Sequence, residues 1–430
     1  MIKAPRGTND ILPPESHKWN RLEALLRRLS RIHNFEEIRT PMFEHTELFS
    51  RTVGETTDIV QKEMYTFQDK GGRDLTLRPE GTAPVVRAFL EHGLDSGALP
   101  RKLFYLGPMF RYEKPQAGRY REFVQYGVEV LGSRSPYSDV EVILLSVRIA
   151  EELGLKGTSL FINTIGCPVC RKRHKEDLIK HLSEKAPALC PDCQNRLEKN
   201  PLRVMDCKNP ACRAITAGAP SIHDYLCPDC KDHWDTLKSI LTSMGLEYFV
   251  DPALVRGLDY YTNTVFELKW PPLGAQDTII GGGRYDGLVE ELGGKPLPGV
   301  GFAMGLERLL LAAEKGEKPI DPHVRADCFV VTPDSEDQEV SREIAIRGFQ
   351  LVKDFRSLGL SCDFDPLRRS IKAQMKHANR LNARYVVILG EEELKKNAAA
   401  IRSMEHGWQK EVALGLVLGF MKEELSGGSN

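Results

Sequence analysis

The run "YREFVQYGVEVLG" at residues 120–132 alternates strictly between two kinds of side chain. Val128 and Val130 point to one side, whereas Gln125 and Glu129 point to the other, and this period of two predicts a β-strand. An amide and a carboxylate on one face fit a solvent-exposed antiparallel sheet. They equally fit the floor of a cleft that binds a polar ligand. At this point both interpretations are open.

The preceding run "RKLFYLGPMFRY" (101–112) reads as a second strand, and the proline and glycine between the two runs predict a long hairpin. Helical spacing predicts a helix over 16–33 with Ser16 as its cap. The other expected elements are a helix at 136–153, strands at 159–164, 247–250, 263–269 and 299–303, and a helix from Met304 to Gly316. After a charged, proline-containing linker at 314–326, strands alternate with helices. This predicts a separate α/β domain of about 100 residues with some parallel pairing.

The overall balance of charge and hydropathy excludes several classes of protein. The net charge is −1, so there is no general positive field that would attract nucleic acid, and such contacts need local basic patches. The longest apolar run, 412–421, is too short to cross a bilayer. The first residues are polar and interrupted by proline, unlike an export signal. We therefore expect a cytoplasmic protein that does not associate with a membrane.

Ten cysteines are present, and eight of them lie between Cys167 and Cys230. Without an export signal, a disulfide framework is not the expected use of these thiols. They could bind two zinc ions with four thiolates each, or they could be reduced thiols that pack a small lobe. The sequence does not fix how they pair. The candidate ligands are Cys167, Cys170, Cys190, Cys193, Cys207, Cys212, Cys227 and Cys230.

Several further stretches carry arginine next to glycine or aromatic residues. They lie at 74–90, 254–268, 281–294 and around Arg308. A strand-to-helix turn with Thr82 as cap would explain part of the first stretch. The glycines of the third would allow backbone contact with a ligand. None is a P-loop, because the Gly-Lys-Ser/Thr element is missing. Together they predict ATP held by guanidinium groups on an antiparallel sheet.

These motifs resemble the histidyl-tRNA synthetases, a family of class II aminoacyl-tRNA synthetases, over nearly the whole chain. The matching stretches are "RGTNDILP" (6–13), the segment around Pro41, "TLRPEGTA" (76–83), "FRYEKPQAGRYREFVQYGVE" (110–129), "LVRGLDYYTNTVFE" (254–267), "GGGRYDGL" (281–288) and "GFAMGLERLL" (301–310). The resemblance implies an enzyme that joins histidine to ATP as histidyl-adenylate and then transfers histidine to its tRNA. It also implies a homodimer whose interface surrounds Pro41.

The implied fold is α+β. An antiparallel catalytic sheet would occupy 1–166 and 241–322, a Cys-rich insertion 167–240, and an α/β anticodon-binding domain 326–430. The resemblance also assigns roles to individual residues. For ATP, Arg111 would hold the α-phosphate and Arg308 the γ-phosphate, with Glu113 and Arg119 as further contacts. For histidine, Glu80 and Thr82 would anchor the α-amino group, and the side chains that surround the substrate would be Gln125, Glu129, Tyr260, Tyr261 and Tyr285. Arg256 would be catalytic together with Arg111, and it would lie where other class II enzymes place Mg²⁺ at the α-phosphate.

A basic stripe is expected in the last domain, where positive side chains recur every fourth residue with no acidic residue from 366 to 384. The residues are Arg368, Lys372, Lys376, Arg380 and Arg384. Such spacing places them along one side of a helix. The stripe could be a solvated face. Beside the resemblance to an anticodon-binding domain, contact with RNA phosphates is favoured, through Lys372, Lys376 and Arg380.

One alternative function belongs to a different class. A synthetase-like regulatory subunit of ATP phosphoribosyltransferase shares the catalytic fold but does not charge tRNA. Such a paralogue typically lacks the anticodon-binding domain and loses the ATP-binding arginines. This sequence retains both features, which favours the ligase.

Overall fold

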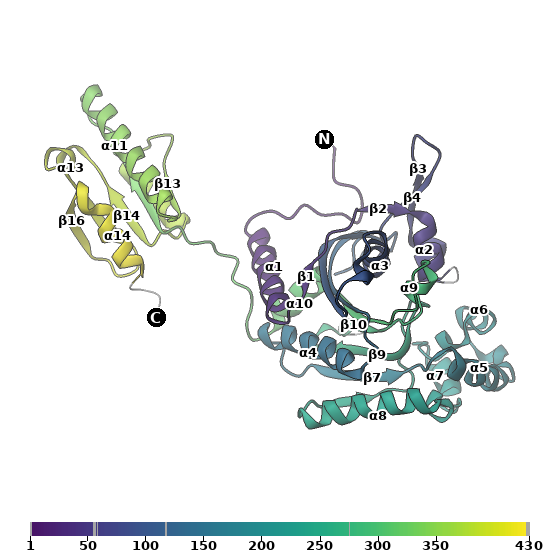
Figure 1. The fold of residues 1–430 in the computed structure, drawn as a ribbon. Coiled ribbons are helices and arrows are strands. Elements are labelled where there is room, and N and C mark those ends of the chain that lie inside the picture. Colours follow the sequence, from purple (N-terminus) through teal and green to yellow (C-terminus); the bar gives the residue numbers. More distant parts are fainter. Residues whose placement is uncertain (1, 55–56, 58, 117, 275, 427–430) are drawn as a thin grey trace. The chain divides into compact units, whose positions relative to one another are not determined.

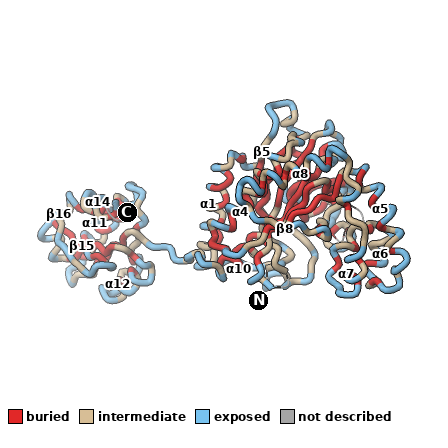
Figure 2. Tube along the Cα trace, turned by 90° about the horizontal axis from the view of Figure 1, so that it is seen from below, coloured by how far each residue is buried: buried red, intermediate tan, exposed pale blue. Residues whose placement is uncertain are grey.

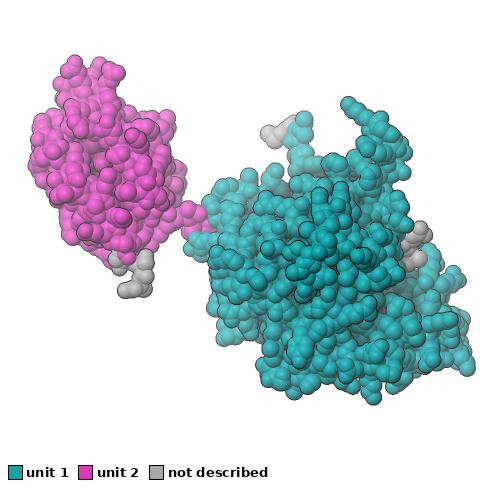
Figure 3. All heavy atoms as spheres, in the orientation of Figure 1, with its two compact units in different colours: residues 1–321 teal, residues 322–430 magenta. Residues whose placement is uncertain are grey.

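The computed structural model describes residues 2–54, 57, 59–116, 118–274 and 276–426. The chain forms two compact units, Met1–Asp321 and Pro322–Asn430, coloured separately in Figure 3. The boundary between them falls within the predicted linker at 314–326. The division of the first unit into catalytic and insertion parts stays a prediction. Within the described residues, no helix is both long enough and apolar enough to cross a membrane.

An eight-stranded sheet forms the centre of the first unit (Figure 1). Its strands, in spatial order, are β1 (Glu36–Glu37), β5 (Arg101–Phe110), β6 (Glu122–Leu131), β11 (Gly299–Gly305), β10 (Thr278–Arg284), β9 (Thr262–Lys269), β7 (Ser159–Thr164) and β8 (Tyr248–Val250). The strands from β5 to β7 pair antiparallel, and only the outermost pairs, β1–β5 and β7–β8, are parallel. The hairpin expected from the sequence is therefore confirmed as β5–β6.

One face of this sheet is covered by four helices that form the largest apolar cluster (Figure 1). They are α1 (Glu15–Ile32), α4 (Pro136–Glu152), α8 (Pro228–Ser243) and α10 (Leu306–Lys315). Tyr126, Val128 and Val130 of β6 point into this cluster and are buried. Figure 2 shows the buried residues running along the strands. The alternation at 120–132 therefore separates a helix-covered face from the opposite, more polar face.

The opposite face contains one row of paired residues whose middle members have almost no side chain. This row crosses five neighbouring strands, and its residues pair in the order Tyr105, Gly127, Ala303, Gly281 and Glu267. Directly paired residues of antiparallel strands project from the same face. Side chains from the edges of this row can therefore extend over the sheet, because its middle positions contribute at most a methyl group.

The remaining elements of the first unit surround this face. They are α2 (Thr46–Val53), α3 (Thr82–Glu91), α9 (Leu288–Glu291), a small sheet of β2 (Phe43–His45), β4 (Asp74–Leu77) and β3 (Tyr65–Gln68), and the insertion helices α5 (Pro168–Ser183), α6 (Pro191–Lys199) and α7 (Pro210–Thr216). Helix α3 packs on the polar face through Val85, Val86 and Phe89. Part of that face stays uncovered, and the cavity described below lies there.

Three local predictions were wrong, and one strand was not predicted. Helix α1 begins at Glu15 after Pro14, with no side-chain cap, so Ser16 is already helical. Thr82 is the first residue of α3 rather than its cap. Met304 belongs to strand β11 and not to the helix that carries Arg308. The glycines at 281–283 lie within strand β10, which was not expected because glycine has a low strand propensity.

The second unit has a five-stranded mixed sheet in the order β13 (Cys362–Phe364), β12 (Cys328–Val331), β14 (Tyr385–Ile388), β15 (Ala398–Ser403) and β16 (Gln409–Ala413). Its helices are α11 (Gln338–Ser357), α12 (Ile371–Arg380), α13 (Glu391–Lys395) and α14 (Val417–Ser426). Strand β12 pairs in parallel with both β13 and β14. The expected α/β pattern with parallel pairing is therefore confirmed.

The predicted basic stripe is shorter than expected. Lys372, Lys376 and Arg380 lie on α12 and are exposed. Arg368 precedes the helix with a φ of 49° and forms an ion pair with Asp334, so it does not extend the stripe. Arg384 follows the C-terminus of the helix and is also outside it. The stripe therefore consists of three residues.

A buried ion pair links α4 to β10. The Arg284 guanidinium contacts the Asp139 carboxylate, and the two side chains are 1% and 0% exposed. His233 Nε2 lies 3.3 Å from Asp139 Oδ1. Burial alone would raise the pKa of Asp139, but Arg284 and His233 lower it to about 2.

Replacing Asp139 by Asn should lower the free energy of unfolding by about 3 kcal/mol, because the buried Arg284 charge would lose its buried carboxylate partner and keep only the more exposed Asp286. Glu151→Gln on the same helix breaks an exposed pair and should cost about 0–1 kcal/mol. Denaturant titration of both variants measures the loss in the free energy of unfolding. The pair should stabilise the wild type fully above its unfolded pKa of 3.8 and progressively less as the pH falls toward 2. Equal losses in the two variants would contradict this role.

Candidate active site

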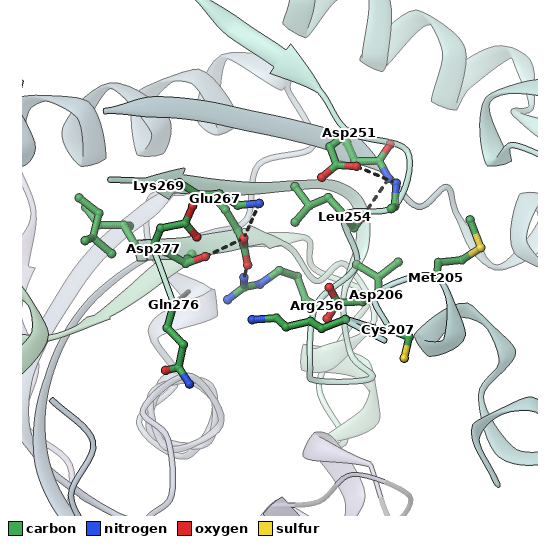
Figure 4. Close-up of a pocket in the computed structure, with 18 of the residues that line it drawn as sticks. Met205, Asp206, Cys207, Asp251, Leu254, Arg256, Glu267, Lys269, Gln276 and Asp277 are labelled. Atoms are coloured by element: carbon green, nitrogen blue, oxygen red, sulfur yellow. Dashed lines mark hydrogen bonds and ion pairs between the residues drawn. The ribbon is translucent and has the colours of Figure 1, made fainter. Parts of the chain in front are cut away.

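A cavity of about 1150 Å³ opens on the polar face of the central sheet. Strands β6, β9, β10 and β11, the start of α10 and the insertion all contribute to its wall. Figure 4 shows part of this wall, with Glu267 and Lys269 of β9 and Asp206 and Cys207 of the insertion. Among the described residues, seven lysine or arginine and five aspartate or glutamate side chains line it. The basic side chains are Arg111, Arg119, Lys208, Arg213, Arg256, Lys269 and Arg308. The excess of positive charge favours an anionic ligand.

Three of the predicted ATP-binding arginines lie on this cavity wall. Arg111 donates from Nε to the Pro79 carbonyl oxygen at 2.8 Å, which fixes its guanidinium. Arg119 Nη1 lies 3.5 Å from Glu113 Oε2. Burial and the neighbouring Arg119 charge lower the pKa of Arg308. The Nε atom of Arg308 is buried without a hydrogen-bond partner among the described residues. Two nearby guanidinium groups of this kind form a ready site for a phosphate.

Arg256 lies in the middle of the cavity wall, over strands β9 and β10. Figure 4 shows its guanidinium against Glu267, with which it forms an ion pair. The Tyr261 ring lies on another side, 5.9 Å from the guanidinium carbon. A Cβ atom at Gly281 would overlap the terminal nitrogens of Arg256. The glycine therefore gives Arg256 the space to lie flat on the sheet.

A buried cluster of carboxyl and hydroxyl groups adjoins the cavity. Glu129 accepts hydrogen bonds from Tyr285 Oη and, at 2.7 Å, from Thr82 Oγ1. Burial raises the pKa of Glu129 to about 8. Glu80 accepts from the backbone N–H groups of Thr82 and Ala83 at 2.7 and 2.8 Å, and burial raises its pKa as well. Arg111 is near enough to oppose the rise in the pKa of Glu80, but burial outweighs it, so both carboxyl groups are complementary to a cationic ligand.

The predicted site residues thus fall into two groups. Arg111, Glu113, Arg119, Gln125, Arg256 and Arg308 line the cavity. The other predicted residues, Glu80, Thr82, Glu129, Tyr260, Tyr261 and Tyr285, are buried beside it and do not line it. Gln125 and Glu129 connect the groups, since they lie on the same face of β6. The Oε1 atom of Gln125 is buried without a partner in the part of the chain that the structure describes.

Some residues on this face have a structural and not a ligand-binding use. Gly127 leaves room for the Tyr105 ring, which occupies the space where a Cβ at position 127 would lie. Not every arginine-bearing stretch supplies an arginine to the cavity wall. Arg78 instead binds the Thr40 and Pro108 carbonyl oxygens at 2.8 and 2.9 Å, and Arg284 pairs with Asp139. These two arginines hold the fold together.

The cysteines of the insertion converge into two groups of four. One contains Cys167, Cys170, Cys227 and Cys230, and the other contains Cys190, Cys193, Cys207 and Cys212. Within each group the sulfur atoms lie within 4.8 Å of one another, and all eight cysteines are free thiols. Each group therefore has the composition of a four-thiolate metal site. The structure supplies the pairing that the sequence left open.

Comparison with known proteins gives a consistent result. The family model for histidyl-tRNA synthetase matches residues 7–309, and the model for an anticodon binding domain matches residues 327–424. The chain belongs to the histidyl-tRNA synthetase family. The histidine–tRNA ligase of Moorella thermoacetica is 52% identical over 429 residues, covering 100% of both chains. The corresponding ligase of Halothermothrix orenii is 52% identical over 96% of this chain and 97% of its own.

A solved structure extends this similarity to the fold. The apo histidyl-tRNA synthetase of Staphylococcus aureus is 41% identical, with a TM-score of 0.83 over 98% of this chain and 100% of that one. The expected class II synthetase fold, with its anticodon-binding domain, is thereby confirmed. The likeness covers both compact units of this histidyl-tRNA synthetase family member.

Several cavity residues of this family member were missed from sequence. Glu267 alternates with the buried Phe266 and Leu268 on β9, and this pattern could have indicated it. Its Oε2 atom accepts from Thr278 Oγ1 at 2.9 Å. Asp206 and Lys208 reach the cavity from the insertion, far from the other motifs in sequence. No local pattern marks such residues, because only the tertiary fold brings them there.

Proposed function

We propose that the protein is a histidine–tRNA ligase, which activates histidine with ATP and transfers it to the 3′ end of its tRNA. The observation that carries this proposal is the junction of two sites on one sheet face. An arginine-lined cavity suits a triphosphate, and the adjoining carboxyl cluster suits the cationic groups of an amino acid. Membership of the histidyl-tRNA synthetase family supports the choice of amino acid.

In the activation step, the carboxylate of histidine attacks the α-phosphate and pyrophosphate leaves. Negative charge grows on the nonbridging oxygens of that phosphate. Arg111, anchored on Pro79, and Arg256, flanked by Glu267, are the groups proposed to stabilise it. Arg308, with Glu113 and Arg119 nearby, is proposed to bind the γ-phosphate end of ATP. Fixed donors of this kind act without reorganisation during the reaction.

Recognition of histidine is proposed to rest on the buried cluster. Glu80 and Thr82 would anchor the α-amino group, and Glu129 would accept a hydrogen bond from the imidazole. Gln125, Tyr260, Tyr261 and Tyr285 would complete the surrounding wall. A site of buried hydrogen-bonding groups rejects analogues that lack the matching donor by roughly 10⁴–10⁵-fold. The unpartnered Oε1 atom of Gln125 supports this role, because a substrate donor would satisfy it.

Mg²⁺ is proposed to enter with ATP. Magnesium commonly binds through one or two carboxylates together with substrate phosphates. Glu113 is the proposed carboxylate, because it lies on the cavity wall beside the arginines that would bind the phosphates, and the phosphates would offset the repulsion between those arginines and the ion. The ion would neutralise charge on the phosphates, while the arginines keep them in place. Zinc, which we propose for the insertion, would have a structural role and no part in the reaction.

A cytoplasmic homodimer is the proposed assembly, with the contact around Pro41. Met42 and Phe43 follow this proline and are 52% and 54% exposed. Adjacent large apolar side chains with this exposure suit a protein interface. The regulatory-subunit alternative is not favoured, because the chain has both an anticodon binding domain and arginines on the cavity wall.

Histidine-dependent exchange between ATP and pyrophosphate tests the activation step directly. Arg256→His should lower the exchange rate about 10²–10³-fold, because it removes a donor to the transition state. The Michaelis constant for histidine should change much less, since the interaction is made mainly in the transition state. Transfer from supplied histidyl-adenylate to tRNA should be affected less than activation.

Arg148→His is the matched control, because Arg148 is an exposed arginine of α4 that pairs with Glu152. Its exchange rate should equal that of the wild type. Loss of histidine binding in Arg256→His, or an equal loss in both half-reactions, would contradict the proposed role. Absence of histidine-dependent exchange in the wild-type protein would overturn the proposed function itself.

The stripe on α12 is proposed to contact tRNA phosphates. Lys372, Lys376 and Arg380 are exposed and have no ion-pair partner in the described part of the chain. The double variant Lys376→Ala/Arg380→Ala should weaken tRNA binding and reduce the slope of log affinity against log salt by about 2, or about 1 for each lost contact.

The double variant Arg347→Ala/Lys353→Ala is the control, because it removes one arginine and one lysine from the exposed side of α11. Both double variants should form adenylate normally, since the cavity belongs to the other unit. Filter binding at several salt concentrations measures the slopes. Identical slopes for the wild type and the α12 variant would mean that the stripe is only solvated.

A further inference from the structure

We infer that each cysteine tetrad of the insertion binds one zinc ion. The first tetrad is Cys167, Cys170, Cys227 and Cys230, and the second is Cys190, Cys193, Cys207 and Cys212. Four thiolates around zinc at about 2.3 Å place their sulfur atoms about 3.8 Å apart in a tetrahedron. The sulfur of Cys167 lies 3.5 Å from that of Cys170 and 4.0 Å from that of Cys227. Cys190 and Cys207 are 3.9 Å apart.

The local structure around the tetrads repeats in a way that suits thiolates. The three Cys-Pro-x-Cys pairs each begin a helix, with Cys167, Cys190 and Cys227 at the N-cap of α5, α6 and α8. The positive end of a helix dipole stabilises a nearby thiolate. Backbone N–H groups also point to sulfur. Cys190 donates to Cys212 Sγ at 3.2 Å, and Cys227 donates to Cys170 Sγ at 3.1 Å. Such contacts orient metal ligands.

The apolar core of the insertion is too small to explain this arrangement alone. Among the described residues, the buried aliphatic members of its main cluster are Leu178, Leu182, Leu189 and Val204, its other buried members are cysteines, and the remaining apolar side chains around it are only partly buried. Small lobes with so little buried apolar surface usually need a metal or disulfides. The cysteines are not joined by disulfides, so a bound metal is the remaining way to stabilise the lobe. Four thiolates select a soft ion such as zinc.

The two metals would have different structural effects. The first tetrad joins the start of the insertion to its end, because Cys170 follows β7 and Cys227 precedes α8. Arg171, next to Cys170, donates to the Tyr261 carbonyl oxygen at 3.1 Å, so this metal would anchor the lobe beside the active site. In the second tetrad, Cys207 itself lines the cavity between Asp206 and Lys208. That metal would hold this segment in the cavity wall (Figure 4).

Elemental analysis tests the inference on full-length protein prepared without chelator and with zinc in the medium. The wild type should contain about two zinc ions per chain. Cys207→Ser and Cys227→Ser should each contain about half as much zinc, because each removes one ligand of a different tetrad. Cys328→Ser is the control, since Cys328 is a buried free cysteine outside both tetrads. It should retain the full zinc content.

A second measurement does not depend on variants that fold. Wild-type protein in which cobalt replaces the metal should show the visible absorption of tetrahedral four-thiolate Co²⁺. Chelation should increase protease cleavage within 167–230 and leave the second unit intact. Folded wild type without zinc, protein that contains iron instead of zinc, or cysteine variants with unchanged zinc would each overturn the inference.

Discussion

The active face depends on the absence of side chains at the middle of the central sheet. A Cβ atom at Gly281 would overlap the Arg256 guanidinium, and one at Gly301 would overlap the Glu129 carboxylate. Gly301 pairs with Glu129 across β11 and β6, so the carboxylate extends over its own neighbour. Large polar side chains can therefore lie parallel to the strands, close to the backbone. The antiparallel register that aligns these glycines is the condition for the rest of the site.

This constraint explains how opposite charges coexist on one surface. The cavity arginines Arg111, Arg256 and Arg308 come from loops beside the sheet and from α10, whereas Glu129 lies on strand β6 and points into the adjoining cluster. Glu129 contacts hydroxyl groups instead of a guanidinium, and burial keeps its pKa near 8. The arginines remain available for phosphate, and the carboxyl groups remain available for a cation. In the proposed function, a triphosphate and an amino acid would meet at the boundary, where Gln125 and Arg256 lie on the cavity wall.

The sequence predicted the parts of the fold that follow from local periodicity. The β5–β6 hairpin, its polar face and the alternating second unit were all expected and are present. Strand β10 was not predicted, because its glycines have no periodic pattern of hydrophobicity. The predicted basic stripe was longer than the one on α12, because the spacing of the residues alone did not reveal the positive φ at Arg368. For the site, the motifs indicated the arginines and carboxylates.

The remaining site residues depend on long-range contacts. Asp206 and Lys208 reach the cavity only because the insertion folds back onto the sheet. The pairing of Cys190 with Cys207 is equally invisible in sequence, since three of the four cysteine pairs have the same spacing and nothing in the wider Cys207/Cys212 pair says which of them it joins. Arg284 illustrates the opposite error. It lies in a glycine-rich motif that suggests a ligand, yet it neutralises the buried Asp139.

Replacing Gly281 by Ala tests most directly whether the site requires a position without a side chain beneath Arg256. The added methyl group would meet the mobile end of the Arg256 side chain, so the guanidinium should move while the fold persists. Gly287→Ala is the control, because no atom lies within 4 Å of its Cβ position and its φ is −92°. We expect histidine-dependent exchange to fall about 10²-fold in Gly281→Ala, with unchanged thermal unfolding, and to stay normal in Gly287→Ala. Wild-type exchange in Gly281→Ala would contradict the claim that this glycine positions Arg256 for catalysis.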